Sequence, residues 1–264
     1  MHSLKDEKMK TETIVKIEHL SFSYPSFSLK DVSFEVRKGI FFGIIGPNGS
    51  GKTTLLSLIM KFQKPKSGKI TIDGNDVLRL SHKKLAQLIA YIAQDFNPAY
   101  DFTVEELVEM GGIPRSPHFF ETPVYEEELE NALKTVDLLE YRKRIFSTLS
   151  GGQQRRVLIA RAIYQNTPII IADELVNHLD LGQAIKVLDY LKQLTERGKT
   201  IIGTFHDITL AAKYCDEIAV MKDGKIIAIG KPLDVVNREI LSNIYGVSLN
   251  VIRHPDKGYP LILI

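Results

Sequence analysis

The sequence predicts an α/β fold in which a mixed β-sheet core carries an antiparallel β-subdomain near the N-terminus and an inserted α-helical subdomain. Three observations lead to this prediction. Short runs dominated by apolar residues, typical of strands buried in a parallel sheet, lie at residues 40–45, 168–172 and 199–205. Apolar and polar residues alternate, as in strands with one exposed face, at 13–20, 31–36 and 69–74. Between residues 95 and 149, prolines punctuate helical patterns instead.

The composition is that of an ordinary globular protein. The chain has 264 residues, of which 44% are hydrophobic and 25% charged, and a formal net charge of +2. This charge is too close to neutral to indicate a nucleic-acid surface. The single cysteine, Cys215, excludes a disulfide within the chain, and its surroundings favour a small buried side chain over a reactive thiol.

No segment of the sequence looks like a membrane anchor or a signal peptide. Apolar runs stay well short of the roughly 18 residues of a membrane span, and the N-terminus is polar. We therefore expect any membrane role to be exercised from the cytoplasmic face, through a partner. The predicted organisation is a single domain, 13–264, after a flexible N-terminus, 1–12, with a catalytic core, 13–94 and 150–264, and a helical insertion, 95–149.

The insertion should contain two capped helices. Thr103 is the predicted N-cap of the first, which ends before Gly111. Thr122 is the predicted N-cap of the second, with Pro123 at the first helical position.

The most specific single motif is a glycine-rich loop between the apolar run 40–45 and a segment that can open a helix. It fits the pattern G-x-x-x-x-G-K-[ST] and comprises Gly46, Pro47, Asn48, Gly49, Ser50, Gly51, Lys52, Thr53 and Thr54. Glycines let backbone N–H groups close around phosphate oxygens, and the helix N-terminus adds positive potential. In such a loop Lys52 reaches the β- and γ-phosphates, and the Thr53 hydroxyl can bind Mg²⁺. The predicted ligand is a nucleoside triphosphate with Mg²⁺.

Polar residues follow several of the predicted strands. Asp173 and Glu174 end one buried strand, where adjacent carboxylates are costly unless they serve a cation or a reaction. Asp173 fits a Mg²⁺ shell, and Glu174 could polarise an attacking water. His206 and Gln94 each follow another strand, and each is either structural or part of the phosphate site.

Two further motifs admit two interpretations each. Tyr24, which precedes a proline, is either an aromatic platform for adenine or an edge-strand tyrosine. The run Ser150-Gly151-Gly152-Gln153, at the start of a predicted helix, is either a second anion cradle or a capping turn.

Taken together, these motifs match one family. Residues 149–153 read LSGGQ, residues 46–54 match a Walker A loop, and residues 169–173 followed by Glu174 match a Walker B strand. The chain closely resembles the nucleotide-binding subunits of ABC transporters over nearly its full length, which implies a P-loop NTPase fold of the RecA-like kind. The remaining family motifs, the A-loop aromatic, Q-loop glutamine, D-loop aspartate and switch histidine, fall on Tyr24, Gln94, Asp180 and His206.

The resemblance implies a role for each of these residues. The substrate would be ATP, with Tyr24 on adenine and the glycine-rich loop on the phosphates. Thr53 and Gln94 would complete a Mg²⁺ shell with a water-bridged Asp173. Glu174 would be the general base, with His206 on the γ-phosphate, and catalysis would also use Lys52 and Gln94. Nucleotide contacts across a dimer interface would come from Ser150, Gly151, Gly152, Gln153 and Asp180.

Finer features resemble one subgroup, the importers of iron–siderophore complexes, haem or cobalamin. Residues 177–181 read NHLDL as in that group, and 246–247 and 258–261 resemble its C-terminal segment. The resemblance implies a homodimer at the cytoplasmic face of the cell membrane, bound to an integral membrane permease, with a substrate-binding protein acting upstream. One departure is Leu175-Val176, where the family has Pro-Thr; it should alter the turn after the base and could lower turnover.

The insertion is the predicted contact with the permease. Its loops are rich in aromatic residues and proline, among them Tyr100 and Phe119. We expect some of these rings to line a groove for a short cytoplasmic helix of the permease.

The alternative is a soluble ABC ATPase that acts on nucleic acid or ribosomes. Chromosome-maintenance proteins place a long coiled coil between Gln94 and the signature, whereas only residues 95–148 intervene here, without sustained heptads. Translation factors carry two cassettes, and here each motif occurs once. A small-molecule kinase would explain the phosphate-binding loop but not LSGGQ. The expected function is ATP hydrolysis coupled to transport, without direct nucleic-acid contact.

Overall fold

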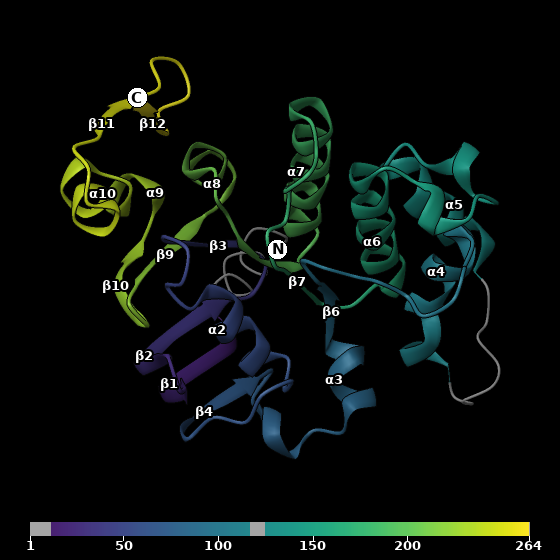
Figure 1. Ribbon diagram of the computed structural model, residues 1–264, viewed down its shortest axis with the longest axis horizontal. Coiled ribbons are helices and arrows are strands. Elements are labelled where there is room, and N and C mark those ends of the chain that lie inside the picture. The colour runs from purple at the N-terminus through teal and green to yellow at the C-terminus, as the bar shows by residue number, and fades with distance from the viewer. Residues whose placement is uncertain (1–11, 117–124, 264) are drawn as a thin grey trace, which may run out of the picture. The chain divides into compact units, whose positions relative to one another are not determined.

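The computed structural model describes residues 12–116 and 125–263, which form two compact units (Figure 1). Unit 1 consists of Met1–Leu80 and Thr195–Ile264, and unit 2 consists of Ser81–Leu194. The boundaries of the helical insertion, 95–149, stay a prediction. Of the predicted flexible N-terminus, 1–12, residues 1–11 lie outside the described residues. Within the described ranges, no helix combines the length and the apolar character needed to span a membrane.

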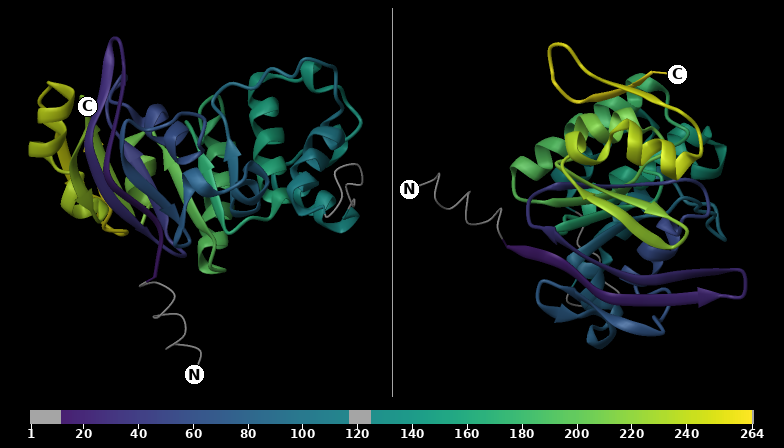
Figure 2. Two further views of the ribbon diagram at one scale, coloured as in Figure 1. Left: turned by 90° about the horizontal axis from the view of Figure 1, so that it is seen from below. Right: turned by 90° about the vertical axis from the view of Figure 1, so that its left-hand side faces the viewer.

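The first sheet of unit 1 is the predicted antiparallel β-subdomain, with strand order β2-β1-β4-β5. Its strands are β1 (Thr13–Tyr24), β2 (Phe27–Arg37), β4 (Ser67–Ile72) and β5 (Asn75–Asp76). β1 and β2 form a long antiparallel hairpin (Figure 2). Ile17 lies opposite Phe34 on β2 and Ile70 on β4, and all three side chains are buried. Its neighbour Lys16 points the other way and forms an ion pair with Glu18 at 3.0 Å. The alternating sequence thus decides which face is covered.

The second sheet of unit 1 places β3 between β8 and β9, both parallel to it, with β10 antiparallel on β9. These strands are β3 (Phe41–Ile45), β8 (Thr200–Thr204), β9 (Glu217–Lys222) and β10 (Lys225–Gly230). Every residue of β3 and β8 is buried, as the apolar runs predict. The turn between β9 and β10 uses Asp223 and Gly224 with φ of 47° and 75°, the geometry that favours Asp-Gly in hairpins.

The remaining elements of unit 1 are helical, apart from a C-terminal hairpin. They are α2 (Lys52–Ile59), the 3₁₀ turn Val77–Arg79, α8 (Ile208–Tyr214), α9 (Pro232–Val235), α10 (Arg238–Tyr245), β11 (Asn250–Arg253) and β12 (Pro260–Leu263). α8 packs on β3 and on β12. Cys215, after α8, is buried as predicted: a Cβ added to Gly43 of β3 would lie 2.6 Å from its Sγ. The sulfur therefore fills the space that the glycine leaves.

Unit 2 is mainly helical and contains one pair of parallel strands. Its elements are α3 (His82–Leu88), β6 (Ile89–Ile92), α4 (Val104–Glu109), α5 (Glu126–Thr135), α6 (Gly151–Gln165), β7 (Ile169–Ala172), most of α7 (Leu181–Glu196) and three 3₁₀ segments, Met110–Arg115, Leu139–Tyr141 and Phe146–Thr148. β6 pairs with β7 in register Ile92 to Ala172. α6 packs against α4, α5 and β6, and its position beside α4 and α5 is visible in Figure 1.

The cap of α4 forms as predicted. Thr103 accepts a hydrogen bond from the Glu106 backbone N–H, and the Glu106 carboxylate accepts one from the Thr103 N–H. α5 begins at Glu126 within the described residues, and Thr122 and Pro123, the predicted start of this helix, lie outside them.

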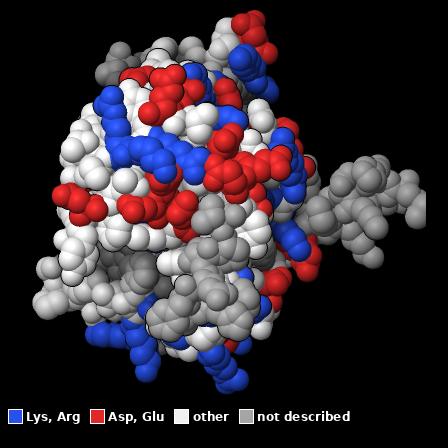
Figure 3. Space-filling view, turned by 90° about the vertical axis from the view of Figure 1, so that its right-hand side faces the viewer, with Lys and Arg blue, Asp and Glu red and all other residues white. Residues whose placement is uncertain are grey.

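Acidic and basic side chains mix on the helical face drawn in Figure 3. Glu105 at the start of α4 accepts hydrogen bonds from Arg142 and Lys143, and Arg142 also bonds to Glu126 at the start of α5. Burial raises the pKa of Glu105, but its two cationic partners outweigh burial and lower the pKa overall. This network fastens the starts of both helices to the segment after α5.

Candidate active site

The glycine-rich loop joins β3 to α2 in unit 1, and its glycines are required for different reasons. Gly46, Gly49 and Gly51 have φ of 153°, 77° and 104°, which disfavours any side chain. A Cβ on Gly46 would lie 2.2 Å from the Met221 carbonyl oxygen, and one on Gly51 would lie 2.6 Å from Phe27 Cζ. A Cβ on Gly49 would meet nothing within 4 Å. Two glycines therefore let the loop pack on its own unit, and the third faces open space.

Lys52 and Ser50 line the inner side of the loop, and both are buried. Lys52 Nζ donates to the carbonyl oxygens of Gly46 and Pro47 at 2.8 and 3.1 Å. The Ser50 hydroxyl has no hydrogen-bond partner among the described residues. A buried hydroxyl without a partner is costly, and here it lies beside a cation and the N-terminus of α2. These features fit a bound phosphate group.

The other loop residues are open to solvent. Asn48 and Thr53 are exposed, and Thr54 is half-buried. Thr53 and Thr54 lie in the first turn of α2, where Thr53 can offer its hydroxyl to a ligand.

Tyr24 lies at the end of β1 beside the loop. Its side chain is 43% exposed and packs edge-on against Phe22, with ring centroids 4.8 Å apart. Tyr24 pairs with Phe27 across the β1–β2 turn, and the Phe27 ring occupies the space that a side chain on Gly51 would need. The exposed tyrosine ring is therefore near the start of α2, where an adenine platform would be needed.

His206 follows β8, the parallel neighbour of β3. The Phe205 N–H donates to the Ile44 carbonyl oxygen at 3.0 Å, so His206 follows its strand at the same edge of the sheet as the loop. His206 is exposed, and the next residue, Asp207, caps α8 by accepting from Leu210 N–H at 2.9 Å. Unit 1 thus brings together Tyr24, the loop and His206.

Unit 2 brings Gln94 and the two carboxylates together in the same way, because they follow two neighbouring parallel strands at one edge of the sheet. Gln94 follows β6, Asp173 follows β7, and the Asp173 N–H donates to the Ile92 carbonyl oxygen at 3.0 Å. Gln94 is exposed, whereas Asp173 is only 1% exposed. Burial, with a contribution from the Asp173 charge, raises the pKa of Tyr91 on β6 to about 12. The carboxylate is therefore held in a region of low polarity.

Glu174 has an unusual backbone conformation. Its φ is 52°, which is uncommon for a residue other than glycine, asparagine or aspartate. Its carboxylate accepts a hydrogen bond from the Asn177 side chain, and its carbonyl oxygen accepts from the Asn177 N–H at 3.2 Å. Leu175, at the first position that departs from the family pattern, is fully buried. The turn after Glu174 is thus closed without the proline.

Arg155 is a site residue that the sequence did not single out. It lies in α6 and is 4% exposed, and its guanidinium donates to the carbonyl oxygens of Ala93, Asp173 and Glu174, the last two at 2.5 and 2.6 Å. Burial lowers its pKa to about 10, although the charges of Asp173 and Glu174 oppose this. One cation therefore connects the LSGGQ helix to both strand ends. The available signal was an arginine at helical spacing from buried Ile159, on an otherwise apolar face.

Ser150 is the N-cap of α6, which agrees with the interpretation of residues 150–153 as a capping turn. Its hydroxyl accepts from Gln153 N–H at 3.3 Å, and the Gln153 side chain accepts from Ser150 N–H at 3.0 Å. A Cβ on Gly152 would lie 2.9 Å from the His178 carbonyl oxygen, whereas one on Gly151 would meet nothing within 4 Å. Gly152 is needed for packing within unit 2, and Gly151 has open space beside it.

Asp180 precedes α7 and is exposed. Its carboxylate accepts from the Gln183 N–H at 2.9 Å, and its carbonyl oxygen accepts from the Ala184 N–H at 2.9 Å. This pattern is that of a helix N-cap.

The comparison with known families decides the identity of this arrangement. A family model described as "ABC transporter" matches residues 29–177. The chain belongs to the ABC transporter family.

Full-length relatives and solved structures of this family resemble the chain. The ferric enterobactin transport ATP-binding protein FepC of Escherichia coli is 33% identical over 258 residues, which is 96% of this chain and 95% of FepC. The hemin import ATP-binding protein HmuV of Thermobifida fusca is 33% identical over 252 residues, covering 95% and 88% of the two chains. A transporter described as metal-chelate type, in an inward-facing conformation, has a TM-score of 0.81 at 25% identity and covers 96% of this chain and 97% of its own.

The ABC family assignment confirms the predicted P-loop fold and ATP as the nucleotide. The dimeric ATP-binding cassette MJ0796, bound to ADP and Pi, superposes with a TM-score of 0.74 at 32% identity over 83% of this chain and 98% of its own. The relatives named here give no support to the alternative of a soluble ABC ATPase that acts on nucleic acid or ribosomes.

Proposed function

We propose that this ABC ATPase is the ATP-hydrolysing subunit of an importer for an iron–siderophore, haem or cobalamin type of cargo. The observation that carries the proposal is the extent of similarity to FepC, which continues past residue 177, where the family model ends, to 96% of the chain. A cobalamin import ATP-binding protein of Halobacterium salinarum, 32% identical over 231 residues, supports the same group of cargoes.

The residues of unit 1 would bind the nucleotide. The Tyr24 ring would stack on adenine, and the loop N–H groups, with Lys52, would hold the phosphates. The orphaned Ser50 hydroxyl and the N-terminus of α2 support this assignment. Mg²⁺, when bound, neutralises charge on the phosphate oxygens, and its proposed ligands are Thr53, Gln94 and, through water, Asp173.

Glu174 is the proposed general base, with His206 on the γ-phosphate. Glu174 lies next to Asp173 in the turn after β7, and its carboxylate accepts a hydrogen bond from the Asn177 side chain, which orients it. Glu174→Gln keeps the shape and removes the proton acceptor, so hydrolysis should fall by about 10² or more while ATP binding survives. The matched control is Glu196→Gln at the exposed end of α7, which should leave turnover unchanged. An unchanged single-turnover rate in Glu174→Gln would remove Glu174 from this role.

The proposed active form is a homodimer. Each copy would contribute a LSGGQ segment and Asp180 to the nucleotide bound by the other copy. The open space beside Gly151 supports this, since no described residue of its own chain comes within 4 Å of a Cβ placed there. The dimeric structure of MJ0796 supports the same assembly.

The proposed partner in the membrane is an integral permease, bound at the cytoplasmic face, with a substrate-binding protein acting upstream. The surface proposed for docking lies in the insertion, where the Tyr100 side chain is 76% exposed and packs edge-on against Phe102. Phe119, the other ring predicted for this contact, lies outside the described residues.

A further inference from the structure

Arg161 lies in α6 of unit 2 and is half-buried, yet its guanidinium has no acceptor within the described ranges. Its five N–H donors therefore meet neither a carboxylate nor a carbonyl oxygen of the described residues. Burial lowers the pKa of Arg161, and no described acidic group opposes this effect. A guanidinium that loses water without gaining an acceptor lowers the stability of the chain.

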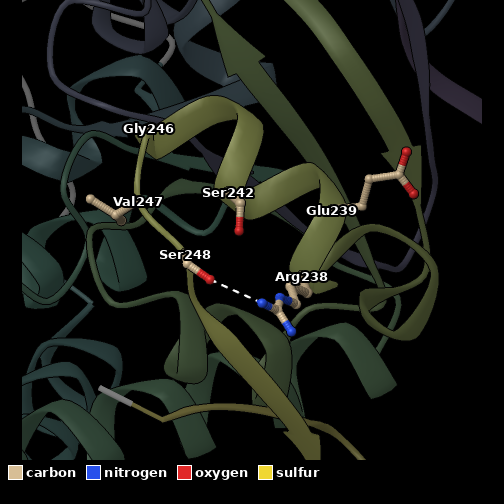
Figure 4. A pocket seen from close by; sticks show the side chains of 6 residues that line it. All are labelled: Arg238, Glu239, Ser242, Gly246, Val247 and Ser248. Carbon is tan, nitrogen blue, oxygen red and sulfur yellow. Dashed lines mark hydrogen bonds between the residues drawn. The ribbon is translucent and has the colours of Figure 1, made fainter.

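The other arginines show that this lack of an acceptor is unusual. Within the described ranges, every other arginine that is buried or half-buried donates a hydrogen bond to an oxygen atom: Arg37, Arg115, Arg142, Arg155 and Arg156. Even the exposed Arg238 donates to the Ser248 hydroxyl at 3.1 Å, beside a pocket on unit 1 (Figure 4). An acceptor supplied by another molecule would remove the exception at Arg161.

The stem and the head of Arg161 are held by different neighbours. A Cβ on Gly111, in the 3₁₀ segment after α4, would lie 3.3 Å from Arg161 Cγ, so the stem packs where the glycine leaves space. The guanidinium carbon lies 5.5 Å from the centroid of the Phe96 ring. Phe96 packs edge-on against Phe146, at a centroid distance of 5.9 Å. An aromatic ring thus orients the cation but does not neutralise it.

Phe96 belongs to the aromatic loop, residues 95–102. The other end of this loop is bonded to the same 3₁₀ turn, because the Phe146 N–H donates to the Phe102 carbonyl oxygen at 2.8 Å. Tyr100 packs edge-on against Phe102 and remains 76% exposed. The loop therefore carries a solvent-exposed ring in the same segment as the ring beside the unpaired cation.

The charges of the aromatic loop favour a single carboxylate over a phosphate group as the missing acceptor. The loop contains two acidic residues, Asp95 and Asp101, and no basic one. A nucleic acid or an anionic membrane surface would be repelled by these carboxylates and would need several cations. A lone arginine with aromatic rings beside it suits one carboxylate in an otherwise apolar peptide segment, which its planar fork can bind through two hydrogen bonds.

We propose that Arg161 pairs with a carboxylate on a cytoplasmic segment of the permease, while apolar side chains of that segment pack on the aromatic loop. The inference rests on the proposed function of this ATPase in an importer, and it adds the chemical group that the permease must supply. α6 runs without interruption from the LSGGQ segment past Arg155 to Arg161. A displacement of Arg161 by the permease therefore moves the LSGGQ segment and Arg155 with it.

The test is Arg161→Met in the full-length chain, which keeps most of the stem and removes the charge and the donors. The dissociation constant for the cognate permease, held in nanodiscs of zwitterionic lipid, should rise about 10-fold or more. ATP-driven cargo uptake in vesicles should fall, because less ATPase is bound at a given concentration. The melting temperature of the ATPase alone should stay the same or rise, since a charge without an acceptor is removed. Its ATPase rate without permease should stay within about twofold of wild type.

The matched control is Arg144→Met. The Arg144 guanidinium carbon also lies over an aromatic ring, 4.7 Å from the Tyr141 centroid, but this arginine is exposed. The control should change neither the affinity for the permease nor the uptake. The pairing itself is tested by replacing each Asp and Glu in the cytoplasmic segments of the permease with Asn or Gln. One replacement should weaken binding of the wild type by a similar factor and weaken binding of Arg161→Met no further.

The outcomes separate recognition of the permease from a structural role. An unchanged affinity of Arg161→Met for the permease would overturn the inference, and so would a weakened affinity that couples to no permease carboxylate. A clear loss of stability of the ATPase alone would make Arg161 a structural residue instead. If wild type binds permease-free vesicles with anionic lipid and Arg161→Met does not, the acceptor is a lipid headgroup, which also contradicts the proposal. A wild type that neither binds the permease nor drives uptake would reject the importer function itself.

Discussion

Replacing Arg155 by lysine should weaken the fold of unit 2 and slow hydrolysis together. The planar guanidinium of Arg155 donates hydrogen bonds to the carbonyl oxygens of Ala93, Asp173 and Glu174. Lysine keeps the positive charge, but it presents three donors on one atom and cannot reproduce the fork. The substitution therefore tests the geometry of the contact rather than its charge.

The magnitude follows from the number of bonds. If lysine keeps one of the three, two bonds from a charged donor are lost, at about 1.5–3 kcal/mol each. Relaxation of the lysine recovers part of this, so the free energy of unfolding should fall by about 2–4 kcal/mol. The backbone of Glu174, with its φ of 52°, would also lose the donor at its carbonyl oxygen. Its carboxylate would then be less well placed.

Urea unfolding followed by circular dichroism measures the first effect, and single-turnover hydrolysis of ATP measures the second. The matched control is Arg156→Lys, because the adjacent guanidinium bonds to the carbonyl oxygens of Val136 and Asp137 and to neither strand end. It should leave hydrolysis close to wild type. An Arg155→Lys protein with wild-type stability and wild-type hydrolysis would refute the reasoning.

Three further predictions concern the dimer, the permease and the acid stability. Ser150→Arg should bind ATP but not hydrolyse it, and mixing it with Lys52→Ala should restore activity through one intact composite site; full activity of Ser150→Arg alone would reject the trans assignment. Tyr100→Glu should reduce cargo uptake in vesicles with the cognate permease while basal ATPase is kept, and unchanged uptake would argue against docking there. Because the folded-state pKa of Glu105 is lowered, its stabilising contribution is present above its ordinary pKa of 4.5 and is lost as pH falls through the lowered value. The melting temperatures of wild type and Glu105→Gln should therefore converge below pH 4.5, and a constant difference would count against the network.

Much of the fold could be predicted because it depends on local patterns. The Asp223-Gly224 pair of the β9–β10 turn is itself a local hairpin signal, since few other pairs accept two positive φ values. The start of α4 followed from Thr103 and Glu106, which cap each other within one turn. The glycine-rich loop followed from its spacing, because Gly46, Gly49 and Gly51 all have a positive φ, which favours glycine.

The rest depends on contacts that a local pattern cannot contain. The apolar face of α6 hints that Arg155 is buried, but its hydrogen-bond partners lie after β6 and β7, and no pattern within the helix contains them. The left-handed backbone of Glu174 could not be predicted either, because glutamate does not favour it.

The conformation of Glu174 implies a conflict between folding and chemistry at one position. A non-glycine residue in this region costs about 1–3 kcal/mol. Aspartate or asparagine would adopt the same backbone more readily, but either would withdraw the functional group by one methylene, and asparagine would also remove the charge. Selection for stability alone would therefore replace Glu174, and selection for hydrolysis would retain it. A library randomised at this codon should separate into two populations, with small or short side chains enriched by thermal challenge and glutamate enriched by growth that depends on uptake.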